Sequence, residues 1–84
     1  MPRWPEWWSW ELELSPHLLK RMLDRRFNEA DLRLMIEDAI DYYWNHVEGR
    51  WVIQTKLAGR GWEVVVEPLA DERILLVITA YAAE

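Results

Sequence analysis

The sequence predicts an α+β domain in which two N-terminal helices pack on an antiparallel meander sheet of three to four strands, in the order β-α-α-β-β-β. Two observations predict this class. Between residues 15 and 46, apolar side chains recur at helical spacing behind two capping residues. Between residues 50 and 81, three segments rich in β-branched and aromatic residues alternate with turns. Two helices that cover one face of such a sheet give a two-layer domain.

The first residues differ in composition from the rest of the chain. Residues 1–8, MPRWPEWW, hold two prolines and three tryptophans, and proline discourages regular structure. We interpret this segment as an arm that is tied down by its aromatic side chains or docks on a partner, and residues 9–84 as a single domain. From Ser9 to Leu14 apolar and acidic side chains alternate, which predicts a short strand at the edge of the sheet.

The first helix has clear start and stop signals. Ser15 is a good N-cap, and Pro16 suits the first helical position because its missing donor would be unused there. The helix is expected to end near Arg26 or Phe27. The side chains expected to face the core are Leu18, Leu19, Met22 and Leu23.

The second helix is expected to be longer. Asn28 caps it, with Asp31 three residues later in the manner of a capping box. Apolar side chains then recur at helical spacing until the pattern fades at Asn45 and His46, and Gly49 ends the helix. Its buried stripe is expected to comprise Leu32, Ile36, Ala39, Ile40 and Tyr43.

The remaining residues are expected to form strands at 50–57, 62–67 and 74–81. The glycines of the segment 59–61 predict a tight turn between the first two, and residues 68–73 form a longer polar turn. Alternation along each strand predicts one apolar face against the helices and one mixed face. The apolar face is expected to comprise Trp51, Ile53, Thr55, Leu57, Trp62, Val64, Val66, Ile74, Leu76, Ile78 and Ala80.

Composition limits the range of functions. The chain has 84 residues, which suits one small domain, and its formal net charge is −5, which argues against sequence-blind binding of nucleic acid. There is no cysteine, hence no thiolate ligand. His17 and His46 lie far apart in sequence and form no metal-ligand motif. No apolar run is long enough to span a membrane and no signal-peptide pattern begins the chain, so we expect a cytoplasmic protein without a metal site.

The first helix carries the strongest candidate for chemistry. His17, Arg21 and Arg25 are spaced four residues apart, so they line one helical face. An imidazole beside two guanidiniums can hold a phosphate. The same pattern is also that of an ordinary solvated helix face, with ion pairs to acids such as Asp24. The sequence leaves both interpretations open.

Several short motifs follow one another in a defined order over residues 10–81. His-x3-Arg in the first helix precedes a Gly-Arg-Trp entry to a strand, a Val-Val-Glu-Pro segment and a closing Val-Ile-Thr-Ala-Tyr strand. This order resembles a bacterial family of small proteins of unknown function that is grouped with the RelE-like and BrnT-like toxins. The residues that carry the resemblance are His17, Arg21, Gly49, Arg50, Trp51, Trp62, Glu63, Pro68, Thr79, Ala80 and Tyr81.

The resemblance implies a compact α+β fold and, because several relatives are ribonucleases, a metal-independent endoribonuclease or RNA-binding toxin that needs no cofactor. It implies that His17 acts as a general acid or base, since histidine ordinarily titrates near neutrality. Arg21 and Arg50 would clamp phosphate oxygens. Lys56 would add positive charge, and Tyr81 would stack on a base or donate a proton. RNA and a cognate antitoxin are the implied partners.

An alternative function is a non-catalytic interaction module. The chain is acidic, whereas typical toxin relatives are basic, and it shows no nucleophile motif. In this alternative the protein forms a homodimer, or binds another protein, through the Trp-rich arm or an open edge of the sheet.

Overall fold

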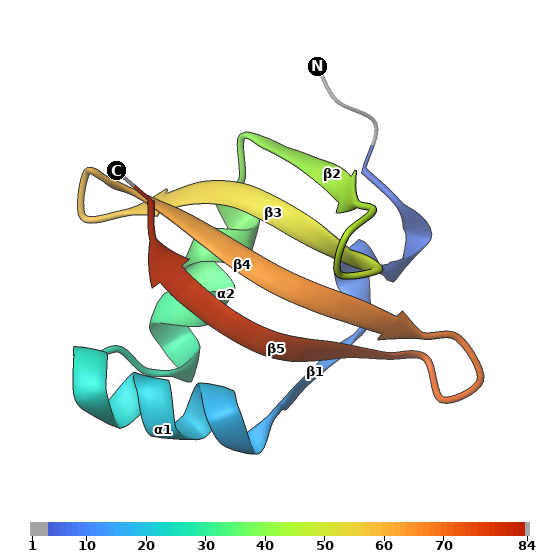
Figure 1. The fold of residues 1–84 in the computed structure, drawn as a ribbon, viewed down its shortest axis with the longest axis horizontal. Coiled ribbons are helices and arrows are strands. Elements are labelled where there is room, and N and C mark those ends of the chain that lie inside the picture. The colour runs from blue at the N-terminus through green and yellow to red at the C-terminus, as the bar shows by residue number, and fades with distance from the viewer. Residues whose placement is uncertain (1–3, 84) are drawn as a thin grey trace.

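The structure, a computed structural model, describes residues 4–83 and confirms the α+β class (Figure 1). In this part of the chain, two α-helices accompany one five-stranded mixed sheet. The elements in chain order are the 3₁₀ turn η1 (Glu6–Ser9), β1 (Glu11–Leu14), α1 (Pro16–Arg25), α2 (Glu29–Glu37), β2 (Asp41–Asn45), β3 (Arg50–Leu57), β4 (Arg60–Leu69) and β5 (Ile74–Ala82).

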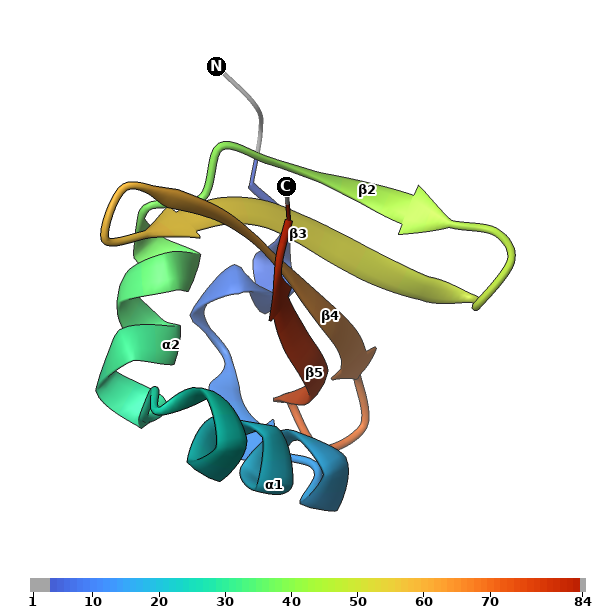
Figure 2. The same cartoon turned by 60° about the vertical axis from the view of Figure 1, so that its left-hand side comes forward.

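The sheet has the order β1-β5-β4-β3-β2. The meander of β3, β4 and β5 is antiparallel, as predicted, and β1 pairs with the edge of β5 in parallel. Both helices lie on the same side of this strongly twisted sheet (Figure 2). The predicted count of three to four strands and the order β-α-α-β-β-β are wrong, because a fifth strand, β2, forms the far edge of the sheet.

The additional strand replaces the predicted end of the second helix. α2 begins with the expected capping box of Asn28 and Asp31, but it ends at Glu37. Residues 41–45, DYYWN, contain three aromatic side chains, which suit a pleated surface better than a helix. Two expected members of the buried helical stripe are therefore exposed, Ile40 by 56% and Tyr43 by 41%. Leu32 and Ile36, which precede the end of α2, are buried as expected.

One side of the sheet packs against the helices to form the core. Its central side chains come from all three meander strands and from both helices. Thr55 is the one buried polar side chain among the described residues. Its hydroxyl donates a hydrogen bond to the Met35 carbonyl of α2, which anchors that helix to β3. The buried apolar side chains of this cluster are Trp7, Leu18, Phe27, Leu32, Met35, Ile36, Ile53, Val64, Val66, Leu75, Val77 and Ala80.

A bulge in β5 changes which side chains of this strand face the core. Val65 pairs with Thr79 whereas Val66 pairs with Val77, so Ile78 is an extra residue. One inserted residue reverses the alternation of faces. Ala80, after the bulge, is in the core as predicted. The prediction for Ile74, Leu76 and Ile78 is wrong, because Leu75 and Val77 occupy the core positions.

Candidate functional site

The position of α1 depends on Ser15. Its hydroxyl accepts a hydrogen bond of 3.0 Å from the Leu18 N–H, as an N-cap does, and donates one of 2.6 Å to the Ile78 carbonyl of β5. Its own N–H donates to the Val77 carbonyl at 3.1 Å. One residue therefore ends the parallel pairing of β1 with β5 and begins the helix, which places α1 beside the C-terminal half of β5 (Figure 1).

Because α1 lies beside the sheet rather than across it, only part of its apolar face is covered. Leu18 is fully buried and Met22 packs against the core. Leu19 and Leu23, which were expected to face the core, are 49% and 82% exposed. The helix is thus held by Leu18, by Met22 and by the bonds of Ser15.

The polar face of α1 lines a cavity of about 410 Å³. The predicted helix-face residues His17, Arg21 and Arg25 all contribute to it, so their four-residue spacing does place them together. Lys20 and Asp24 complete its lining. The cavity therefore combines one imidazole and three cationic side chains with a single carboxylate.

A second cavity, of about 370 Å³, adjoins the first, because Arg21 and Arg25 line both. Its other walls come from β4 and from the end of β5, and they include one more arginine and two aromatic residues. These wall residues are Arg60, Trp62, Tyr81 and Ala82. We call the two adjoining cavities the cationic cleft.

Arg21 lines both cavities of the cationic cleft. Its Nε atom is buried and has no hydrogen-bond partner among the described residues. A buried nitrogen of a charged group without a partner is costly. In these two cavities the Arg21 guanidinium can bind a phosphate or carboxylate through N–H···O bonds.

Tyr81 contributes to the wall of the cationic cleft, but its side chain shares with Glu63 the sheet face opposite to the helices. The hydroxyl donates a hydrogen bond of 2.7 Å to Glu63 Oε1. Burial, with the hydrogen bond and the negative charge of Glu63, raises the pKa of Tyr81 to about 12. Such a hydroxyl is a poor proton donor at neutral pH, which argues against proton transfer by this residue.

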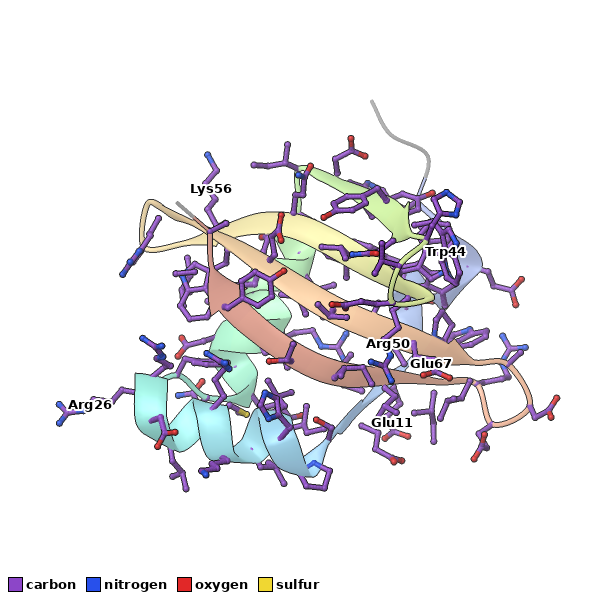
Figure 3. The ribbon with its side chains drawn as sticks, viewed as in Figure 1. Glu11, Arg26, Trp44, Arg50, Lys56 and Glu67 are labelled. Carbon is purple, nitrogen blue, oxygen red and sulfur yellow. The ribbon has the colours of Figure 1, made fainter. Side chains whose placement is uncertain are left out.

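Two of the predicted site residues lie outside the cationic cleft. Arg50 lines a different cavity, at the start of β3, and its Nε atom is 3.7 Å from Glu67 Oε1. Lys56 is exposed on β3 and points away from α1, as Figure 3 shows. The structure thus brings His17, Arg21 and Tyr81 to one cleft and leaves Arg50 and Lys56 apart from it.

The sequence did not identify the two cleft residues of β4 as site residues. Arg60 follows the β3–β4 turn and was assigned to that turn alone, and Trp62 was expected only in the core. Trp62 does contact the buried Phe27, with ring centroids 5.1 Å apart. Both residues reach the cleft because β4 pairs with β5, a contact that no local spacing reveals.

An aromatic cluster lies at the opposite end of the sheet. The arm contributes to it, because Trp4 stacks on Trp8 with centroids 4.4 Å apart and Trp7 lies 5.9 Å from Trp51. The cluster comprises Trp4, Trp7, Trp8, Tyr42, Trp44 and Trp51. A cavity of about 350 Å³ beside it is lined by three of these tryptophans and by the Arg50–Glu67 pair.

The described residues contain no group of three or more His, Cys, Asp and Glu side chains that could hold a metal ion. None of the helices in this part of the chain is long and apolar enough to cross a membrane.

Comparisons of the chain with protein-family models, with curated proteins and with solved structures found no match.

Proposed function

We propose that this protein binds RNA through the cationic cleft and is a metal-independent endoribonuclease of the toxin type that its sequence motifs resemble. The observation that carries the proposal is the lining of the cleft. Three arginines, Arg21, Arg25 and Arg60, line one cavity together with the aromatic residue Trp62, beside the cavity that His17 lines. Guanidiniums bind phosphates, and aromatic rings stack on the bases of single-stranded RNA.

The overall charge does not contradict a local phosphate site. The net charge is −5, but cationic side chains gather on α1 and near the β3–β4 turn, whereas acidic side chains predominate elsewhere. Charges of one sign in a cleft raise the local concentration of an oppositely charged ligand. We therefore expect a short, strongly salt-dependent contact with RNA rather than a long basic surface.

His17 would supply the proton transfer. In the proposed step the imidazole accepts the proton of the ribose 2′-hydroxyl while this oxygen attacks the adjacent phosphorus. The bond from phosphorus to the 5′-oxygen breaks, and the leaving oxygen takes a proton from water. The products are a 2′,3′-cyclic phosphate and a 5′-hydroxyl. Arg21 and Arg25 would stabilise the charge that develops on the phosphoryl oxygens.

The experiment uses a fluorescent single-stranded RNA of about 12 nucleotides, with EDTA present. Fluorescence anisotropy measures binding, and denaturing gels measure cleavage. We expect Arg25→Ala to weaken binding by about tenfold and to reduce the slope of log K against log salt by about 0.7, the value for one lost phosphate contact. His17→Ala is expected to abolish cleavage and to retain most of the binding.

The chain offers a matched control for each variant. Arg50→Ala and His46→Ala change the same residue types outside the cationic cleft, and we expect neither to alter binding or cleavage. Absence of binding by the unchanged protein would refute the proposal, and so would equal losses in Arg25→Ala and Arg50→Ala. Binding without cleavage would remove the ribonuclease activity from the proposal and leave RNA binding.

A further inference from the structure

We infer that β2 is a self-association edge, through which two copies of this chain pair their β2 strands antiparallel about Tyr43 to form a continuous ten-stranded sheet. The proposal is independent of the cationic cleft. The cleft is lined by residues of β4 and β5, whereas β2 is an edge strand that pairs only with β3 among the described residues. The proposal starts from the position of β2, which pairs with β3 on one side and with no other strand of residues 4–83 on its outer side.

Exposed apolar side chains concentrate on this edge. Among the described residues, seven large apolar side chains are exposed, and four of them lie on β2 or next to its ends. Tyr43 and Trp44 are each 41% exposed and point to opposite faces of the sheet. Ile40 and Val47, at 56% and 95% exposed, extend the apolar surface beyond both ends of the strand. A neighbouring strand would cover the aromatic side chains on both faces at once.

The two edges of the sheet differ in how they are protected. β1, the edge strand on the other side, has only four residues, and its Glu11 and Glu13 are exposed. Short length and charge are devices by which proteins prevent edge-to-edge pairing. β2 contains no lysine or proline and pairs with β3 without a register shift. The hydrogen bond of 2.8 Å from the Tyr42 N–H to Asp41 Oδ1 offers local protection, which strand pairing would replace.

The sequence of β2 indicates that the strand that pairs with this edge is the β2 strand of a second copy, because β2 is complementary to itself. In an antiparallel pair centred on Tyr43, this residue faces the second copy's Tyr43. Tyr42 then faces the second copy's Trp44, and Asp41 faces the second copy's Asn45. Aromatic side chains thus meet aromatic side chains, and the strand's one charged residue meets an amide rather than a like charge. Two-fold symmetry of this kind is the commonest arrangement in homodimers.

Two properties of the dimer follow. Strands of five residues make an interface below the standard size, so we expect a dissociation constant in roughly the micromolar range. Each copy carries a net charge of −5, so moderate salt is expected to strengthen the association by screening the repulsion. Both properties can be measured by sedimentation velocity of the full chain from about 1 to about 500 µM.

The decisive test uses two variants at one position. Tyr43→Lys and Tyr43→Glu each place like charges opposite one another, so each variant alone is expected to be monomeric at every concentration. An equimolar mixture is expected to recover the dimer, because opposite charges then face each other across the two-fold axis. Leu23→Lys is the control, since it removes an apolar side chain that is 82% exposed on α1, and it is expected to dimerise normally. Near-UV circular dichroism checks that every variant is folded.

Three results would overturn the proposal. The first is an unchanged protein that stays monomeric over the whole concentration range. The second is a dimer that survives Tyr43→Lys, which would locate the interface elsewhere. The third is a mixture of the Lys and Glu variants that stays monomeric, which would exclude a two-fold axis at Tyr43.

Discussion

The two ends of the sheet differ in what their side chains contribute. At the end formed by α1 and the β3–β4 turn, charged groups line an open cleft, and Figure 3 shows Arg26 and Lys56 extending outward. At the opposite end the aromatic cluster joins the arm to β2 and β3, and Trp7 at its centre is 8% exposed. Charged side chains that remain in water add little stability, whereas buried rings add much. Rings that stabilise the domain therefore concentrate at one end and charged groups that could bind a ligand at the other, and Trp62 belongs to both the core packing and the cleft.

The largest expected difference between the two ends is in the free energy of unfolding, when one residue of each end is replaced by alanine. Trp7→Ala removes a buried ring that contacts Trp8, Tyr42 and Trp51, so we expect the free energy of unfolding to fall by about 3–5 kcal/mol. Arg25→Ala is expected to change it by less than about 0.5 kcal/mol, because this side chain is exposed. Urea denaturation followed by circular dichroism measures both.

A domain of this size is stable by roughly 4–13 kcal/mol in all, so Trp7→Ala can leave too little folded protein to measure. Trp7→Phe then serves as a graded variant, since it keeps a ring and is expected to lose less. Stability that depended more on Arg25 than on Trp7 would contradict the separation of the two ends.

Ser15 tests how the cationic end is attached to the sheet. Ser15→Ala removes the N-cap of α1 and leaves the Ile78 carbonyl without its hydroxyl donor, so we expect a loss of about 1–2 kcal/mol. Ser15→Thr keeps both hydrogen bonds and is the matched control. Hydrogen exchange should show faster exchange for the amides of α1 and unchanged exchange for those of β3. Equal acceleration in both would mean that Ser15 stabilises the whole fold rather than the attachment of the helix.

Local signals in the sequence predicted the elements that local interactions determine. The cap at Ser15, the capping box at Asn28 and the end of α1 near Arg26 are confirmed, because each depends on residues within one turn of the helix. The helical face of His17 and Arg21 was predictable for the same reason. These features require no knowledge of what the chain meets elsewhere.

The errors arose where distant segments decide the structure. Residues 32–43 fit a helical period, and only the pairing of β2 with β3 selects the strand at Asp41–Asn45. The bulge at Ile78 is invisible to an alternation pattern, which assumes an uninterrupted strand. Arg60 and Trp62 reach the cationic cleft through the pairing of β4 with β5, so their place beside α1 could not be predicted from spacing.

The smallest expected change in the free energy of unfolding comes from the β3–β4 turn, which lies at the cationic end of the sheet. The predicted turn at residues 59–61 is displaced by one residue, and the turn residues are Ala58 and Gly59, with φ of 53° and 78°. Two consecutive left-handed residues are typical of a type I′ hairpin turn, in which Asn-Gly is the preferred pair. Alanine in the left-handed region is strained by its Cβ atom.

Ala58→Asn is therefore expected to raise the free energy of unfolding by about 0.5–1 kcal/mol, because asparagine tolerates the left-handed conformation and glycine already follows it. Ala70→Asn is the matched control in the β4–β5 turn, where Ala70 has no positive φ, and it is expected to change stability by less than about 0.5 kcal/mol. Thermal denaturation measures both variants. Because the substitution adds no charge beside Arg60, RNA binding should stay unchanged while stability rises. A gain in stability that came with weaker binding would show that strain at this turn contributes to the shape of the cleft, and would link the two properties that the two ends otherwise keep apart.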